Sequence, residues 1–218
     1  MAAIFLDLDG TLTDPKPGIT GAVRHALRAL GLPVPDADAL EWVIGPPLLD
    51  SFARLGASDP HAALAIYREH YMDHGLYDAR VYDGIPDAIE TLANAGHRLF
   101  LATAKPHVYA VRITAHFGLD ARLEAQFGPE LDGTLNDKGE LLRHALGLTG
   151  LDGADAIMVG DRDVDLRSAR VNKMRFVGAL WGYGTAAELD GADIGCARPV
   201  DLAAGISALT GRFPRKAR

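Results

Sequence analysis

Short apolar runs alternate with helical segments along most of the chain, and this alternation restricts the fold more than any other feature. Four of the runs are brief, strongly apolar and partly β-branched or aromatic, as in buried strands. These runs are Ala3–Leu8, Arg98–Ala102, Ala156–Val159 and Arg175–Leu180. Strands that are separated by helices usually pair in parallel, so the pattern predicts an α/β fold with a mostly parallel sheet.

Glycines mark the expected ends of the helices between these strands. The segments Asp87–Ala95, Pro106–Phe117 and Lys138–Leu146 have helical periodicity, and each is followed directly by a glycine. Glycine after the last periodic residue is a common helix stop, because it takes the left-handed conformation at little cost. We therefore predict a helix at each of these segments.

The stretch of residues 15–79 interrupts the alternation. It contains several helical segments and no convincing strand. One segment has an apolar-aromatic face that includes Tyr67 and Tyr71, which we expect in a core rather than in a platform for stacking bases. The chain is therefore predicted to divide into residues 1–14 and 80–218, which form the sheet, and a helical insert of residues 15–79.

The charge of the chain argues against a nucleic-acid-binding protein. Lys and Arg number 22 and Asp and Glu number 29, which gives a formal net charge of −7. A nucleic-acid-binding face usually carries a basic stripe, and no long stretch of this sequence has one. The only basic cluster lies at the C-terminus, where a solvated tail is the usual outcome. Its residues are Arg212, Arg215, Lys216 and Arg218.

Several features lead us to expect a cytoplasmic protein that binds no membrane. Cys196 is the only cysteine, so no disulfide can form within the chain, and its surroundings match no signature of a catalytic thiol. The sequence starts without the charged region of a secretory signal, and no apolar run reaches the ~18 residues needed to span a bilayer. His70 and His74 are one helical turn apart, but without an HExxH pattern they do not predict a zinc site.

The segment with the strongest chemical signal is Asp7-Leu8-Asp9-Gly10-Thr11-Leu12-Thr13, at the end of the first strand. Asp7 and Asp9 are separated by one residue, and alternate side chains of a strand point to the same face. Gly10 permits a sharp turn directly after them. An acidic turn without function is the alternative interpretation of this segment.

Polar residues also follow the other predicted strands. Thr103 comes after the second strand, and Asp161 and Asp165 come after the third. Each of them alone has a plain structural explanation, as a hydroxyl or carboxylate that caps the next helix. Lys138, at the start of a predicted helix, would usually be a solvated surface residue. Their functional interpretation depends on their meeting at one place.

One edge of the sheet is the expected meeting place. In an open parallel sheet, ligands bind beyond the carboxyl ends of the strands. Asp7, Asp9, Asp161 and Asp165 would gather there, and carboxylates in one cleft repel one another unless a cation lies between them. Oxygen ligands without His or Cys favour a hard ion, for which Mg²⁺ is the natural choice. With one hydroxyl and one ammonium added, the site suits a phosphate dianion bound against the metal.

Taken in order, these motifs resemble those of the haloacid dehalogenase superfamily of phosphotransferases. The resemblance runs from Asp7 to Asp165 and implies a Rossmann-like three-layer core with a small helical cap inserted after the first motif. It implies that Asp7 is the nucleophile, which takes the phosphoryl group as an aspartyl-phosphate, and that Asp9 protonates the leaving oxygen and later activates water. The residues implied to bind phosphate are Thr103, Ala104 and Lys138, and those implied to hold Mg²⁺ are Asp7, Asp9, Asp161 and Asp165.

Further motifs resemble the phosphoglycolate phosphatase and bacterial 5′-nucleotidase-like branch of this superfamily. They are Ile44-Gly45-Pro46-Pro47-Leu48, Val81-Tyr82-Asp83-Gly84, Thr103-Ala104-Lys105-Pro106 and Leu180-Trp181-Gly182-Tyr183-Gly184. Gly45, Pro46 and Pro47 are candidates for selecting the leaving group, and a simple helix-connecting turn is the alternative. The fourth superfamily motif departs from the expected pattern at Val164 and Ser168 but keeps its carboxylates.

The resemblance implies a Mg²⁺-dependent phosphatase of small phosphate monoesters, most like phosphoglycolate phosphatase or 5′-nucleotidase. Two alternatives stay open. One is phosphoryl transfer, as in mutases or in members directed at protein phosphotyrosine. The other is a catalytically idle binding module, which the undamaged motifs disfavour. The expected partner is a small phosphate monoester, with neither nucleic acid nor membrane, and the chain is expected to be a monomer or a weak homodimer.

Overall fold

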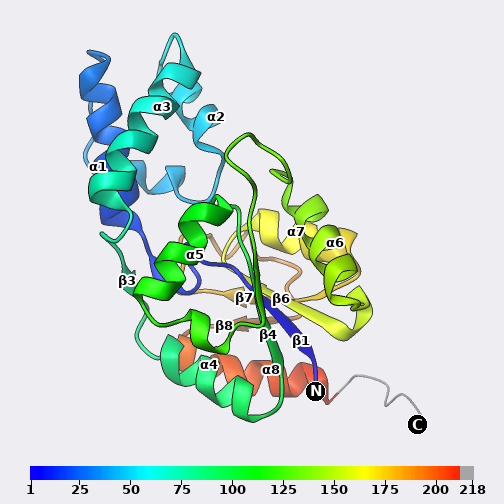
Figure 1. Ribbon diagram of the computed structural model, residues 1–218. Helices are drawn as coiled ribbons and strands as arrows, with labels where there is room; N and C mark the ends of the chain where they lie inside the picture. The colour runs from blue at the N-terminus through cyan, green and yellow to red at the C-terminus, as the bar shows by residue number, and fades with distance from the viewer. Residues whose placement is uncertain (212–218) are drawn as a thin grey trace. The chain divides into compact units, whose positions relative to one another are not determined.

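The computed structural model describes residues 1–211, and the chain divides into two compact units (Figure 1). Among the described residues, one unit contains residues 1–12 and 81–211, and the other is Thr13–Arg80. The predicted helical insert lies inside the second unit, and its role as a separate cap domain stays a prediction. The basic cluster of the predicted C-terminal tail lies outside the described residues. It consists of Arg212, Arg215, Lys216 and Arg218.

A six-stranded sheet forms the centre of the first unit, and every neighbouring pair of its strands is parallel. The strand order is β5-β4-β1-β6-β7-β8, so the chain starts in the middle, builds one half of the sheet and then the other. This order is that of a Rossmann-like fold, and it confirms the predicted α/β class. The strands are β1 (Ala3–Leu6), β4 (Arg98–Ala102), β5 (Ala125–Phe127), β6 (Ala156–Gly160), β7 (Arg175–Ala179) and β8 (Ile194–Cys196).

One face of the sheet is covered by α6 (Lys138–Thr149) and α7 (Asp163–Val171), which pack against each other. The rings of Phe5 and Phe100 stack between strands β1 and β4, with centroids 4.8 Å apart. Buried aliphatic side chains of both helices join these rings in one apolar core. Because side chains alternate across a strand, this core uses every second residue of β1 and β4.

The opposite face is covered by α4 (Ile85–Asn94) and α8 (Leu202–Thr210), as Figure 1 shows. The remaining elements of this unit are α5 (His107–His116), η3 (Asp120–Arg122), η4 (Gly153–Asp155) and η5 (Pro199–Asp201). The three helices predicted from glycine stops are present in the sheet-containing unit. The helix predicted to stop before Gly147 continues to Thr149 and ends at Gly150, which has the left-handed φ of 65°.

The second unit is helical. Its elements are α1 (Lys16–Ala29), η1 (Asp38–Val43), α2 (Leu48–Arg54), α3 (Pro60–His70) and the π-helical turn η2 (Tyr71–Gly75). Where this unit begins and ends along the chain, the short strands β2 (Thr13–Asp14) and β3 (Arg80–Val81) pair with each other. The Asp59 side chain caps α3 by accepting the backbone N–H of His61 at 3.0 Å. Tyr67 and Tyr71 are buried and their rings stack 5.4 Å apart, which confirms that they belong to a core.

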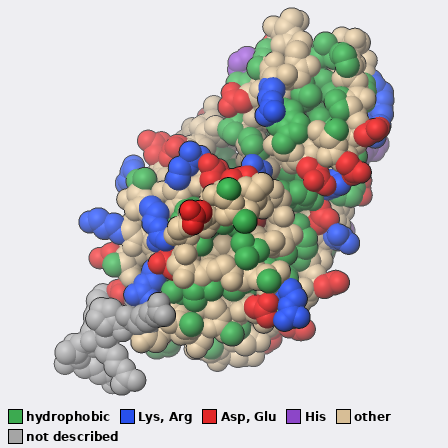
Figure 2. All heavy atoms as spheres, turned by 180° about the vertical axis from the view of Figure 1, so that it is seen from behind, with side chains coloured by type: hydrophobic (Ala, Val, Ile, Leu, Met, Phe, Trp, Pro, Cys, Tyr) green, Lys and Arg blue, Asp and Glu red, His purple; other side chains and the backbone are tan. Residues whose placement is uncertain are grey.

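Among the described residues, every helix is too short or too polar to cross a lipid bilayer. On the face shown in Figure 2, acidic and basic side chains are interspersed. This distribution is in keeping with the mixed composition of the chain, in which 23% of the residues are charged.

Candidate active site

The site residues of the first unit follow the central strands of the sheet. Asp7 follows β1, Thr103 follows β4 and Asp161 follows β6, and these three strands are direct neighbours. The backbone N–H of Asp7 donates to the carbonyl oxygen of Val159 at 2.9 Å, which extends the β1–β6 pairing to the first site residue. The strand order reverses at β1, and in open parallel sheets ligands bind at such a switch point.

Three carboxylates meet at this point. Asp7, Asp161 and Asp165 each offer an oxygen, and these oxygens all lie within 4.8 Å of one another. All three side chains are buried. Oxygen donors at this spacing fit a hard divalent cation, so the cluster could hold a metal ion.

Lys138 supplies positive charge to the same cluster. Its ammonium donates to Oδ1 of Asp7 at 2.7 Å and forms a second ion pair with Asp165. The side chain is 2% exposed, which contrasts with the solvated surface position usual for a lone lysine. The lysine reaches the cluster because it is the first residue of α6, where the side chain of Asp137 caps the helix.

The electrostatics of the cluster reflect an excess of negative charge. Burial, with help from Asp165 and Asp7, raises the pKa of Asp161 to about 8. Burial also raises the pKa of Asp165, against the opposing pull of Lys138. For Lys138 itself, burial alone would lower the pKa, but the two neighbouring carboxylates outweigh it and raise the pKa above its usual value. A divalent cation would relieve this excess of negative charge.

Asp161 is held from two sides by groups that lie in motifs singled out in the sequence but that were given no role there. The Thr11 hydroxyl donates to its Oδ1 at 3.3 Å, and the backbone N–H of Tyr183 donates to its Oδ2 at 2.8 Å. Two glycines permit this packing. Gly10 has a left-handed φ of 85°, and a Cβ there would lie 2.6 Å from Cγ of Asp161. A Cβ on Gly182 would lie 2.5 Å from the Oδ2 oxygen.

Asp9 is paired with a lysine that sequence analysis left without a role. Its Oδ2 lies 2.9 Å from the ammonium of Lys105, and the two side chains are 12% and 5% exposed. Burial raises the pKa of Asp9, while Lys105 pulls it down. The three-carboxylate cluster does not include Asp9. The sequence-based assignment of Asp9 to the metal stays a prediction.

The remaining predicted site residues lie in two places. Thr103 is buried after β4, its hydroxyl accepts the backbone N–H of Lys105 at 3.2 Å, and Ala104 stands between these two residues. Their predicted contact with phosphate stays a prediction. Gly45, Pro46 and Pro47 belong to the helical unit, in the turn between η1 and α2, and their predicted role in substrate selection also stays a prediction.

The unusual residues of the fourth motif leave its carboxylates in the cluster. Asp165 lies in the first turn of α7, where its Oδ2 accepts the backbone N–H of Arg162 at 3.0 Å. Val164 is half-buried, and Ser168 is buried on the same helix, near Gly139 of α6. A small side chain at this position suits the close approach of the two helices.

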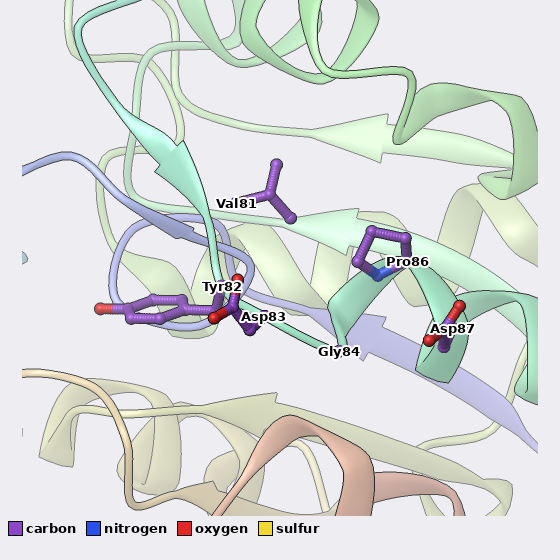
Figure 3. Close-up of a pocket in the computed structure, with 6 residues that line it drawn as sticks. All are labelled: Val81, Tyr82, Asp83, Gly84, Pro86 and Asp87. Carbon is purple, nitrogen blue, oxygen red and sulfur yellow. The ribbon is translucent and has the colours of Figure 1, made fainter.

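A pocket of about 220 Å³ lies where the chain returns from the helical unit and α4 begins (Figure 3). It is lined by all four residues of the Val81-Tyr82-Asp83-Gly84 motif and by two residues of α4. Its lining residues are Val81, Tyr82, Asp83, Gly84, Pro86 and Asp87. None of the predicted site residues lines it, so the candidate site rests on the geometry of its side chains.

Comparison with known proteins agrees with this geometry. Residues 4–179 match the family of haloacid dehalogenase-like hydrolases. A 5′-nucleotidase of Pseudomonas aeruginosa is 46% identical over 189 residues, which cover 85% of this chain and 86% of that protein. A plasmid-encoded phosphoglycolate phosphatase of Cupriavidus necator is 31% identical, over 83% of this chain and 81% of that protein.

A third relative carries a different name. The tyrosine-protein kinase PtkA of Mycobacterium tuberculosis is 36% identical over 86% of this chain, but the match spans only 65% of that protein. Among solved structures, a haloacid dehalogenase-like hydrolase from Streptococcus pneumoniae superposes with a TM-score of 0.88 at 30% identity. That match covers 94% of this chain and 97% of the other. The chain therefore belongs to the haloacid dehalogenase-like hydrolase family, and its relatives place it among the phosphatases of that family.

Proposed function

We propose that this protein is a Mg²⁺-dependent phosphatase that hydrolyses small phosphate monoesters with Asp7 as the nucleophile. The observation that carries the proposal is the contact of Asp7 with Lys138 at 2.7 Å, within a cluster that also contains the buried carboxylates of Asp161 and Asp165. A carboxylate is a competent nucleophile when the charge of the incoming phosphate is neutralised. Mg²⁺ held by the carboxylates would supply that neutralisation, and Lys138 would add a fixed positive charge.

Each residue then has one task. An oxygen of Asp7 attacks phosphorus and forms an aspartyl-phosphate, while the bond to the leaving oxygen breaks. Asp9 protonates the leaving oxygen and afterwards takes a proton from the water that hydrolyses the aspartyl-phosphate. Thr103, Ala104 and Lys138 bind the phosphoryl oxygens, whose negative charge must be stabilised in the transition state.

The proposed substrates are small soluble metabolites. A nucleoside 5′-monophosphate is the first candidate, because the relative named 5′-nucleotidase is 46% identical. Phosphoglycolate is the second, on the weaker similarity to a phosphoglycolate phosphatase. The helical unit would act as a cap, in which Gly45, Pro46 and Pro47 select the leaving group. We further propose that the protein is a cytoplasmic monomer or weak homodimer; its single cysteine, which can form no disulfide within the chain, supports the location.

A second candidate function is phosphoryl transfer to an acceptor other than water. The similarity to a protein named tyrosine-protein kinase favours it, because nucleophilic capture of phosphate by Asp7 is compatible with both outcomes. The products distinguish the two functions. A phosphatase releases inorganic phosphate, whereas a transferase returns the phosphoryl group on a tyrosine or another hydroxyl.

The test is phosphate release from a panel of phosphorylated metabolites, with Mg²⁺ or with a chelator. Wild-type protein should release phosphate only with the metal, and Asp7→Asn should lose at least ~10³-fold in kcat, because the nucleophile is gone. The control is Asp163→Asn, which makes the same chemical change at a surface carboxylate paired with Arg167. Phosphate release by Asp7→Asn at the wild-type rate would end the proposal.

A further inference from the structure

Lys105 is a buried charged residue at the strand ends that the proposed chemistry leaves without a task, and it forms an ion pair with Asp9. We propose that Lys105 is a positioning residue for Asp9. By holding Oδ2 of Asp9, it keeps the other oxygen, Oδ1, directed at the leaving group. This inference rests on the proposed phosphatase function and adds a requirement to it.

The geometry of the pair is specific. The ammonium of Lys105 lies 2.9 Å from Oδ2 of Asp9, and both side chains are largely withdrawn from solvent, with 5% and 12% exposed. Oδ1 of Asp9 is also buried, yet it has no hydrogen-bond partner among the described residues. A buried carboxylate oxygen without a partner is costly, so one that persists calls for a ligand. The leaving oxygen of a phosphate ester would be that ligand.

The backbone holds Lys105 in place. Its N–H donates to the Thr103 hydroxyl at 3.2 Å, directly after β4. On the other side, Gly128 packs so closely that a Cβ there would lie 2.6 Å from the carbonyl oxygen of Lys105. The backbone of Lys105 is therefore fixed on both sides. From there its side chain reaches Asp9, which follows the neighbouring strand β1. A surface ion pair would have no such support.

The proposed proton transfers involve only Oδ1. In the first step Asp7 bonds to phosphorus, the bond from phosphorus to the leaving oxygen breaks, and the proton on Oδ1 of Asp9 moves to that oxygen. In the second step water bonds to phosphorus, one of its protons returns to Oδ1, and the bond from phosphorus to Asp7 breaks. Oδ2 stays with Lys105 throughout, so the acid keeps its orientation in both steps.

The experiment compares two substrates that differ in how much they need an acid. An alkyl phosphate has a poor leaving group that must be protonated, whereas p-nitrophenyl phosphate has a good one that leaves without a proton. Lys105→Met removes the ammonium and keeps most of the side-chain volume. We expect kcat to fall by ~10²-fold or more for the alkyl phosphate, as when a general acid is lost, and by less than ~10-fold for p-nitrophenyl phosphate.

Double substitution tests whether Lys105 acts through Asp9. The variant Asp9→Asn should show the same contrast between substrates, and adding Lys105→Met to it should cost little more for either substrate. Lys105→Arg, which keeps the positive charge, should recover part of the alkyl phosphatase activity. The control is Lys173→Met, which removes an exposed ammonium and should leave both activities unchanged.

The outcomes separate this inference from the proposed function. Equal losses on both substrates, or a double variant that multiplies the two single losses, would overturn the positioning role while wild-type activity stands. If wild-type protein has no Asp7-dependent phosphatase activity, the function fails and this inference fails with it. If Lys105→Met does not fold, Lys105→Leu, which also removes the ammonium, is compared on the same two substrates with the same two criteria.

Discussion

Replacing Asp161 with asparagine should make the metal-free protein more stable while it destroys the metal site. Asp161 is fully buried beside Asp7 and Asp165, and burial together with their charges raises its pKa to about 8. In the unfolded chain the same group has a pKa near 3.8. At about pH 7 the unfolded carboxyl is ionised and the folded one is largely protonated, so folding is penalised.

The size of the penalty follows from the difference between the two states. The unfolded-state pKa of 3.8 lies roughly 3 units below about pH 7, and each unit costs ~1.4 kcal/mol. The carboxyl of Asp161 therefore lowers the free energy of unfolding by ~4 kcal/mol. Relaxation of the site reduces the figure, so we expect Asp161→Asn to gain ~2–4 kcal/mol in free energy of unfolding. Asparagine keeps an oxygen for the backbone N–H of Tyr183, which now donates to Oδ2 at 2.8 Å.

The assay is urea denaturation in the presence of a chelator, at about pH 7 and about pH 4. In the wild-type protein, the folded state retains a proton on Asp161 that the unfolded state loses. The contribution of Asp161 to the free energy of unfolding therefore falls as the pH rises from about 4 to 8. The advantage of the variant should therefore be largest near neutrality and nearly absent at about pH 4. Adding Mg²⁺ should stabilise wild-type protein and leave Asp161→Asn unchanged.

The control is Asp163→Asn, two residues further along the chain, at the first residue of α7. Asp163 pairs with Arg167 on the helix surface at 3.0 Å, and this change should alter stability by less than ~1 kcal/mol. The reasoning is refuted if Asp161→Asn is no more stable than wild-type protein in the chelator. It is also refuted if the difference between them is the same at both pH values.

Two further predictions concern residues that support the site and the sheet. Gly182→Ala would place a Cβ 2.5 Å from Oδ2 of Asp161, so the apparent Mg²⁺ affinity should fall by ~10–100-fold in a metal titration. The control Gly147→Ala, which has open space around it, should leave the affinity unchanged. Equal Mg²⁺ affinities of the two variants would contradict this packing argument. His97 accepts the backbone N–H of Ala2 at 3.2 Å, and burial lowers the pKa of its imidazole. The contribution of the neutral imidazole to the free energy of unfolding should therefore be lost as the pH falls below about 6.5. His97→Gln, which keeps an acceptor, should show a smaller acid loss in urea denaturation across that range, and an unchanged pH profile would rule the contact out as its cause.

Much of the fold could be predicted because its central strands are distinct apolar runs and the helices between them have helical periodicity that ends at a glycine. The strand predicted at Arg98–Ala102 is observed with the same bounds, and the three others differ by one or two residues at their ends. The strands β5 and β8 were not predicted. Each has three residues, and β5 contains the polar Gln126 and is only partly buried, so neither forms a distinct apolar run.

The site could be predicted only where its residues carry a sequence signal. Asp7, Asp161, Asp165 and Lys138 stand at strand and helix ends, and the structure brings all four together. Lys105 stands in a motif that the sequence singled out, but it was given no role. A lysine after a strand usually reaches solvent, and the burial of this one depends on Asp9, which is far away in the chain.

The backbone N–H of Tyr183 was missed for a different reason. It binds Asp161 through a main-chain group, which every residue other than proline has, so its identity carries no sequence signal. Only the packing of the Trp181–Gly184 loop against Asp161 shows its role. The sequence singled out this loop as a motif, and its glycines indicate a close approach of the backbone to a side chain, but neither feature names the group that Tyr183 binds.

The central claim is that Asp7 is the nucleophile beside a metal ion held by the buried carboxylates. A crystal structure with Mn²⁺ and beryllium fluoride tests it most directly, because beryllium fluoride mimics a phosphoryl group and Mn²⁺ is visible by anomalous scattering. The account predicts one metal peak among the carboxylates of Asp7, Asp161 and Asp165, and beryllium bonded to an oxygen of Asp7. A metal bound away from these carboxylates, or a beryllium fluoride that leaves Asp7 unmodified, would contradict it.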